Sequence, residues 1–182
     1  FAATPPWADL RMILSQATTG DSAKCLMIID VSRAYMYAPV NEDMYVDICD
    51  EARGAKSEGK CWKLLKSMYG TRPAALNWQR ELSRDLEKHG FEPGRASPCT
   101  FSHATRGISL FVHGDDFMVV CNRRDVGWLK EAAERRFTVK VEVCGHGVGE
   151  AKEVTILNRV VRAVRGGWEY EADQRHGEII VR

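Results

Sequence analysis

The chain has 182 residues and 45% of them are hydrophobic, which is enough for one sizeable buried core and a small appendage. Its 26 Lys and Arg nearly balance its 25 Asp and Glu, so bulk charge neither indicates nor excludes a nucleic-acid partner. The six cysteines are widely spaced, with no CxxC pair and no histidines at finger spacing, which argues against a zinc site and for free thiols in a reducing compartment.

The first third of the chain contains one helix and three strand candidates. Residues 6–17 carry a proline at the opening position and apolar residues at helical spacing, which predicts a helix. Residues 24–30 form an apolar run that ends in an acid, which indicates a buried strand with Asp30 at its exit. Two short strands are expected at 44–48 and 61–65. No apolar run approaches the roughly 18 residues of a membrane span, and no signal peptide is visible.

The rest of the chain begins with its clearest helix, at 73–89, which a proline opens and a glycine closes. Residues 108–121 are two apolar runs around His-Gly-Asp-Asp, the pattern of a β-hairpin. Asp125 can cap a further helix that ends near Phe137. Three more strand candidates follow, at 138–143, 153–162 and 167–171. This order of elements predicts an α+β fold, with helices packed on one face of a mainly antiparallel sheet.

The adjacent acids Asp115 and Asp116 are the strongest local signal for function. They fall at the turn of an otherwise apolar hairpin, where two carboxylates repel each other unless a positive charge lies between them. A hard divalent cation with oxygen ligands meets that need. The alternative is ordinary turn chemistry, since Gly and Asp both favour turns.

Asp30 offers a third carboxylate. It ends an apolar strand, and Tyr35 follows it five residues later. One carboxylate at a strand exit and two more in a hairpin turn can converge on two magnesium ions, which would stabilise the attacking and leaving oxygens of a phosphoryl displacement. The alternative for Asp30 is an ordinary strand-end acid or a helix cap.

Several segments resemble the reverse transcriptases of copia-type retrotransposons, in the same order along the chain. Residues 28–40 (IIDVSRAYMYAPV) resemble the first polymerase motif of that family, and residues 110–120 (LFVHGDDFMVV) resemble its third, usually Tyr-Val-Asp-Asp. Residues 64–82 (LLKSMYGTRPAALNWQREL) are similar to its Tyr-Gly-Leu-Lys-Gln-x-Pro-Arg-x-Trp string. Three further segments also resemble the family, at 1–17, 128–145 and 153–162.

The resemblance implies a fold, an activity and a cofactor. The fold is a polymerase palm, a ferredoxin-like antiparallel sheet with helices on one face, with part of the fingers and without the thumb. The activity is that of an RNA-directed DNA polymerase, a nucleotidyltransferase that joins deoxynucleotides to a primer 3′-hydroxyl. The cofactor is two Mg²⁺ ions, for which Mn²⁺ can substitute.

The resemblance also divides the chain, which it treats as one partial reverse transcriptase domain over residues 1–182. The junction of fingers and palm would comprise residues 1–23 and 37–72. The palm would comprise residues 24–36 and 73–150. Residues 151–182 would form the end of the palm and the start of the connection to the thumb. Because the chain begins at Phe1 and not at a methionine, we expect a fragment of a longer polyprotein or of a decayed gene.

The matching motifs imply roles for single residues. Asp30, Asp115 and Asp116 would be the catalytic metal ligands, and the Val31 carbonyl would be a backbone ligand. Tyr35 would lie under the sugar of the incoming nucleotide, where its ring excludes a 2′-hydroxyl. Its alternative role is that of a core tyrosine.

A second group of residues would border the nucleotide and the template: Tyr69, Gly70 and Arg72. The alternative for Arg72 is a solvated loop arginine. Trp78 is expected to be a core anchor, because it lies on the apolar stripe of its helix, and its alternative role is that of a base-stacking platform. Lys140 is expected to be a solvent-facing strand residue, with a role near the leaving pyrophosphate as the alternative.

The main departure from the family pattern is His113-Gly114, which stands where Tyr-Val is usual before the two acids. The family's tyrosine packs near the primer end, so the primer contact would fall to His113 and Gly114. Gly114 also adds backbone freedom beside the metal ligands. A histidine beside acids is compatible with a hydrolase as well, but no Ser or Cys nucleophile in a recognisable elbow accompanies it.

The implied partners are an RNA or DNA template with its primer, deoxynucleoside triphosphates, and the rest of a polyprotein with integrase and ribonuclease H. No membrane is expected, and the protein would be intracellular, in the cytoplasm alone or in the cytoplasm and the nucleus. Two other interpretations stay open. One is an inactive, truncated palm remnant that binds nucleic acid or a protein, and the other is a metal-dependent phosphohydrolase on an unrelated α+β fold.

Overall fold

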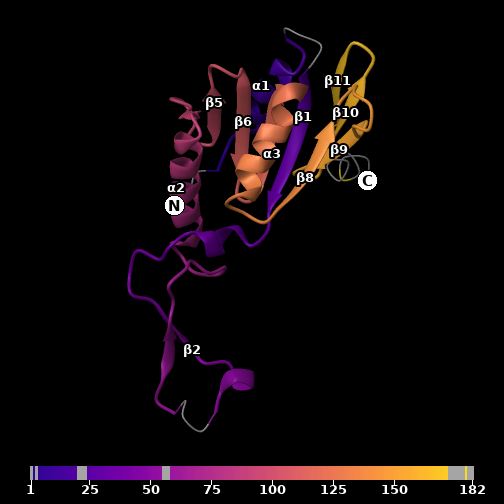
Figure 1. Cartoon of the computed structure of the whole chain (residues 1–182). Helices are drawn as coiled ribbons and strands as arrows, with labels where there is room; N and C mark the ends of the chain where they lie inside the picture. Colours follow the sequence, from indigo (N-terminus) through magenta and orange to yellow (C-terminus); the bar gives the residue numbers. More distant parts are fainter. Residues whose placement is uncertain (1, 3, 20–23, 55–57, 172–178, 180–182) are drawn as a thin grey trace.

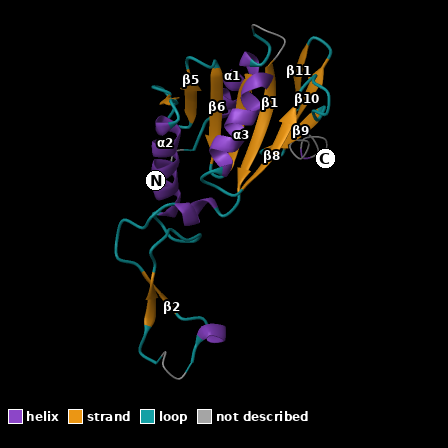
Figure 2. Cartoon of the chain, viewed as in Figure 1, coloured by secondary structure: helices purple, strands orange, loops and turns teal. Residues whose placement is uncertain are grey.

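The centre of the protein is a six-stranded antiparallel sheet in the order β4-β5-β6-β7-β1-β8 (Figures 1 and 2). The computed structural model describes residues 2, 4–19, 24–54, 58–171 and 179. The strands of this sheet are β1 (Lys24–Val31), β4 (Glu92–Pro93), β5 (Thr100–His103), β6 (Ile108–His113), β7 (Asp116–Asn122) and β8 (Val139–Cys144). The mainly antiparallel α+β fold predicted from the sequence is therefore confirmed.

Two helices cover one face of this sheet, α2 (Ala74–Lys88) and α3 (Val126–Glu134). Trp78 and Leu82 of α2 and Leu129 of α3 are buried in one cluster with alternate residues of β1 and β7. Along the chain the elements run β1-α2-β6-β7-α3-β8, and in the sheet the same strands lie in the order β6-β7-β1-β8. That is the arrangement of the ferredoxin-like β-α-β-β-α-β motif.

The opposite face of the sheet carries α1 (Trp7–Gln16). Leu10, Ile13 and Leu14 of this helix pack with Phe111 and Met118 of the central hairpin. The expectation that all helices lie on one face is therefore wrong for α1. The physical reason is that β1 and β7 have buried residues on both faces of the sheet, so both faces need cover.

A second, three-stranded sheet adjoins α1 on that face, in the order β11-β10-β9. Its strands are β9 (Glu153–Ile156), β10 (Arg159–Val164) and β11 (Gly167–Tyr170). The single strand predicted at 153–162 is wrong, because Leu157 and Asn158 break it with φ angles of 48° and 62°. Two successive left-handed residues make the type I′ turn of a tight hairpin. Without a glycine at either position, the turn has a weak sequence signal.

An arm extends from the body between β1 and α2, away from the main sheet (Figure 1). It contains the paired strands β2 (Tyr45–Asp47) and β3 (Cys61–Lys63), which confirm the two predicted short strands. Among the described arm residues, 41–54 and 58–66, Ile48 alone is buried. The arm therefore contributes little to the core.

The other predicted elements agree with the structure to within a few residues, except that α3 ends at Glu134, before the expected Phe137. β4 and β5 were not predicted, because they are short and lack an apolar run. Of the six cysteines, all free thiols, two on the arm are exposed and the others are buried: Cys25, Cys99, Cys121 and Cys144. In the described part of the chain, no helix has the length and apolar character needed to cross a membrane.

Candidate active site

Asp30 and Asp116 are direct neighbours across the two central strands. β1 and β7 are antiparallel, and their register pairs Asp30 with Asp116 where β7 begins, one residue before β1 ends. Directly opposed residues of an antiparallel pair have Cβ atoms about 4.5–5.5 Å apart and point to the same face of the sheet. The fold thus brings together two of the three predicted carboxylates from distant positions in the sequence.

Asp115 belongs to the two-residue turn that joins β6 to β7. Gly114 is the first residue of this turn, and its φ of 65° suits a type II′ turn, which needs glycine at that position. The backbone N–H of Val31 donates to the Asp115 carbonyl oxygen at 3.0 Å. This hydrogen bond ties the turn to the end of β1, so the backbone of the third acid is held next to the first two.

These residues are part of a polar row that crosses four strands. His113 pairs with Asp116, Asp116 pairs with Asp30, and Asp30 pairs with Lys140 of β8. Asp116 is two residues before Met118 in β7, so both side chains point to the same face of the sheet, and Met118 packs under α1 on that face. The row therefore lies on the sheet face opposite α2 and α3. Lys140 is exposed, in line with the solvent-facing position expected for it.

The nearby carboxylates affect the pKa of Asp116. Burial raises the pKa of Asp116, the negative charges of Asp115 and Asp30 raise it further, and His113 acts in the opposite direction. Burial and then the charge of Asp115 also raise the pKa of the Tyr69 phenol. The site is thus negative, and a bound cation would relieve the repulsion.

The available donors suit a hard cation. Asp30, Asp115 and Asp116 offer carboxylate oxygens, and Val31 offers a backbone carbonyl, which are the ligands that Mg²⁺ prefers. Within the described residues, no three His, Cys, Asp or Glu side chains already converge as a preformed metal cluster. All three acids are only partly buried.

Two tyrosines stack beside the acids. Tyr35 lies in a 3₁₀ helix, Ala34–Tyr37, directly after β1, and Tyr69 lies in the loop before α2. Their ring centroids are 4.4 Å apart and the ring planes meet at 25°. The structure therefore brings these two predicted site residues together, close to Asp115, whose charge acts on Tyr69.

The two remaining residues of the predicted nucleotide border differ in their placement. Gly70 directly follows Tyr69 and has a φ of 86°, a conformation that favours glycine. Arg72 is exposed and lines a separate hollow with Glu42 and Leu76. It is not among the residues that line the cavity next to Tyr35.

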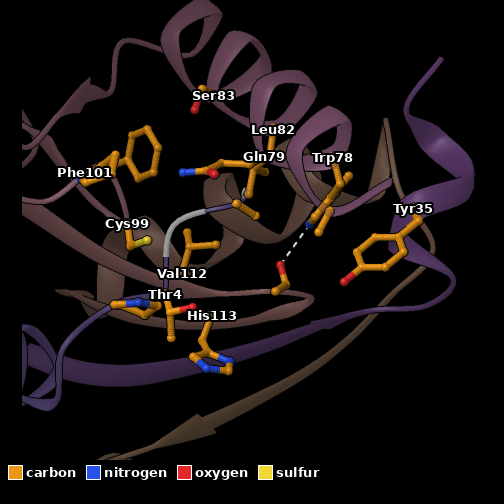
Figure 3. Close-up of a pocket in the computed structure, with 15 residues that line it drawn as sticks. Thr4, Tyr35, Trp78, Gln79, Leu82, Ser83, Cys99, Phe101, Val112 and His113 are labelled. Carbon is orange, nitrogen blue, oxygen red and sulfur yellow. Dashed lines mark hydrogen bonds between the residues drawn. The ribbon is translucent and has the colours of Figure 1, made fainter. Parts of the chain in front are cut away.

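Sequence reasoning missed a polar contact of Trp78. Its ring is 2% exposed, as expected for a core anchor, but its indole N–H donates to the Gly114 carbonyl oxygen at 2.8 Å (Figure 3). A cavity of about 190 Å³ lies beside this contact and is bordered by Tyr35 and His113 as well as by Trp78 and Gly114. The apolar stripe of α2 predicts the burial of the ring, whereas no sequence signal marks the direction of its N–H group.

Comparison with known proteins adds sequence relatives. Residues 6–144 match the sequence profile of the family described as reverse transcriptase (RNA-dependent DNA polymerase). The truncated transposon Ty1-A Gag-Pol polyprotein of Saccharomyces cerevisiae (strain ATCC 204508 / S288c) is 32% identical over 144 residues, which cover 76% of this chain and 11% of that protein. The Ty1-DR5 Gag-Pol polyprotein of the same strain is also 32% identical over 144 residues, covering 76% of this chain and 8% of its own length. The Ty1-DR1 Gag-Pol polyprotein of that strain is 28% identical over 128 residues, which cover 67% of this chain and 7% of that protein.

A solved structure has a similar fold. It is described as apo telomerase from Candida Tropicalis truncated from C-terminal domain, and it superimposes with a TM-score of 0.51 at 12% sequence identity. The match covers 91% of this chain and 38% of that one. At this identity the likeness concerns the fold alone. The chain itself spans between 7% and 11% of the length of the three polyproteins.

Proposed function

The chain belongs to the reverse transcriptase family, in the group found in copia-type retrotransposon polyproteins, and from this premise we propose that it is the palm of an RNA-directed DNA polymerase. The reaction is the transfer of a deoxynucleotide to a primer 3′-hydroxyl. The protein's part in such a reaction is to position the reactants and to stabilise charge at the phosphoryl group, without covalent catalysis.

The observation that carries this proposal is the register of β1 and β7. It places Asp30 opposite Asp116, and the Val31 N–H holds the backbone of Asp115 beside them. We propose that these three carboxylates and the Val31 carbonyl hold two Mg²⁺ ions. When bound, such ions would stabilise the attacking and leaving oxygens of the displacement.

The nucleotide would lie beside Tyr35. The ring of Tyr69 stacks on that of Tyr35, and Tyr69 in turn lies within the influence of the Asp115 charge. We propose that Tyr35 excludes a 2′-hydroxyl, and that Tyr69, Gly70 and Arg72 border the nucleotide and the template. His113, in register with Asp116 on the same face, would contact the primer together with Gly114.

The domain boundaries are part of the same proposal. The ferredoxin-like unit would be the palm, over 24–36 and 73–150, and the arm within 37–72 would belong to the junction with the fingers, as would 1–23. Residues 151–182 would end the palm and lead to the thumb, although 172–178 and 180–182 lie outside the described residues. The template, the primer, the triphosphates and the remainder of a polyprotein are the proposed partners.

A second candidate is an inactive palm remnant. One observation favours it: in the described residues, no three His, Cys, Asp or Glu side chains are already placed to hold a metal ion. Such a remnant would keep the fold and its nucleic-acid surface without polymerising.

Primer extension and metal titration separate the two candidates. The chain is assayed alone and as a chimera whose flanking segments come from the Ty1-A relative, each with Mg²⁺ and with Mn²⁺. Asp30→Asn should abolish extension, whereas Asp47→Asn, at an exposed position on the arm, should leave it unchanged. If neither the chain nor the chimera extends a primer, the remnant is the correct interpretation. If Asp30→Asn extends as well as the unaltered protein, the proposed metal site is wrong.

A further inference from the structure

The turn that carries the acids is thinly packed. Gly114 is exposed, and a Cβ atom added to it would meet no heavy atom within 4 Å. The cavity of about 190 Å³ borders the same residue. Side-chain packing around Gly114 therefore does little to hold this turn in one conformation, and hydrogen bonds to its backbone matter correspondingly more.

Two hydrogen bonds from different elements hold two successive carbonyl groups of the turn. The Trp78 indole N–H donates to the Gly114 carbonyl at 2.8 Å, and the Val31 N–H donates to the Asp115 carbonyl at 3.0 Å. Each peptide unit is planar, so fixing its carbonyl fixes the orientation of the whole unit. The two units lie on either side of the Asp115 Cα. Together they determine its φ and ψ, and hence the direction in which its side chain leaves the backbone.

The indole donor is itself held rigidly. The Trp78 ring is 2% exposed, and Phe137 packs against it edge-to-face, with ring centroids 5.3 Å apart and planes at 78°. Phe137 in turn packs edge-on against Tyr37, with centroids 5.0 Å apart. The N–H group therefore reaches the turn from a ring that is packed in the core, and Figure 3 shows its hydrogen bond as a dashed line.

We propose that Trp78 is a positioning residue for the reaction, which acts by orienting the Gly114–Asp115 peptide and through it the Asp115 carboxylate. This inference rests on the proposed function, because it gives Asp115 a metal to meet. Trp78 does not touch the reacting atoms. It couples α2, on one face of the sheet, to a carboxylate beside the polar row of the other face.

The test removes the N–H donor and keeps an aromatic ring at position 78. Trp78→Phe is the simple variant, and 3-benzothienylalanine at position 78, in which sulfur replaces the N–H group, is the closer match if the phenylalanine variant folds poorly. The matched control is Leu82→Val, one helical turn further along α2 and equally 2% exposed, which disturbs the same part of the core but removes no hydrogen-bond donor. Thermal unfolding establishes that all variants fold.

Two readouts are compared. In the metal-free chain, amide hydrogen exchange of Asp115 and Asp116 should become about two- to tenfold faster when the donor is lost, the factor that one net hydrogen bond represents. In Mn²⁺ titrations of the chain, the dissociation constant should rise by a similar factor. Leu82→Val should lower thermal stability and leave both quantities within about twofold of the unaltered chain.

The outcomes separate the positioning role of Trp78 from the proposed metal-dependent function. Equal exchange and equal Mn²⁺ affinity in the unaltered chain and both position-78 variants would overturn the positioning role. So would an equally large effect of Leu82→Val, because Trp78 would then act only through core stability. If neither the unaltered chain nor the chimera binds Mn²⁺, the proposed function fails, and the exchange rates alone decide whether Trp78 orients the turn.

Discussion

Asp30 of β1 lies directly opposite Asp116 of β7, so two acids of the same charge face each other across the centre of the main sheet. Directly opposed like charges destabilise a strand pair, by about 0.2–1 kcal/mol in typical cases. Both residues are only half-buried, at the level where the turn of the central hairpin meets the end of β1. Packing does not require acids to be gathered in this way, and their repulsion costs stability. Such a cluster of carboxylates is therefore characteristic of a binding site.

The repulsion at Asp116 predicts a pH-dependent gain in stability for Asp116→Asn. Burial, Asp115 and Asp30 raise the pKa of Asp116, so the native state binds this proton more tightly than the unfolded state does. The free energy of unfolding therefore falls as the pH rises from about 3.9, the unfolded value, through the higher native pKa. At pH 7 we expect the variant to be about 0.2–1 kcal/mol more stable, with no gain at low pH.

Urea denaturation at a series of pH values between 3 and 8 measures this difference. The control is Asp47→Asn, since Asp47 is exposed on the arm and has no acidic partner in its strand pair. A variant that is less stable than the unaltered chain at pH 7, or whose gain persists unchanged at low pH, contradicts the prediction.

The backbone at Gly114 predicts opposite effects for two glycine-to-alanine changes. Gly114 has a φ of 65°, and left-handed backbone costs other residues about 1–2 kcal/mol, so Gly114→Ala should destabilise the chain by about that amount. An added methyl group meets no atom there, and the cost is therefore conformational and not steric. Gly127→Ala, in the first turn of α3 and also free of contacts, should instead stabilise by about 0.5 kcal/mol. Thermal unfolding compares the two, and equal effects would be incompatible with this account.

The position of Tyr35 predicts a change in sugar selection. If its ring blocks the 2′-hydroxyl, Tyr35→Val should raise the use of ribonucleotides relative to deoxynucleotides by about tenfold or more, in whichever version of the protein extends primers. Tyr37→Val is the matched control, because Tyr37 lies in the same 3₁₀ helix but packs against Phe137 and accepts a hydrogen bond from the Thr138 N–H. That variant should be less stable and equally selective. Unchanged selectivity in Tyr35→Val would remove this role from the tyrosine.

Thiol accessibility predicts a simple labelling pattern. Cys49 and Cys61 are exposed on the arm and should react with iodoacetamide within minutes at pH 8, whereas the other four should react only on unfolding. Cys144 illustrates the reason: burial is the main cause that raises its pKa to about 11, so little thiolate is present. Peptide mass spectrometry with and without urea counts the labelled sites. Rapid labelling of Cys144 in the native chain would contradict the placement of β8.

The structure could be predicted best from the sequence where a long segment has one clear pattern of apolar residues. The apolar run of β1, the amphipathic α2 and the hairpin of β6 and β7 could be predicted because burial alone shapes them. Prediction failed where a local detail decides the structure. Leu157 and Asn158 form a turn without glycine, and the face on which α1 packs depends on the apolar character of both sides of the sheet, which strand alternation in short runs does not reveal.

The candidate site divides in the same way. The meeting of Asp30 with the hairpin acids follows from two strand ends and a turn, and the structure places their backbones together as that hypothesis required. The indole contact of Trp78 depends on how α2 is rotated against the sheet, which no pattern in the sequence encodes.

The arm also has a consequence for how the polypeptide can be cut. It joins the strand of Asp30 to the helix of Trp78, yet Ile48 is the one buried residue in its described parts. A protease should therefore cleave the arm well before it attacks the sheet, and the two pieces should remain associated through β1, β7 and β8. The same segment is accordingly the natural place to split the gene into two halves that reassemble when they are produced together.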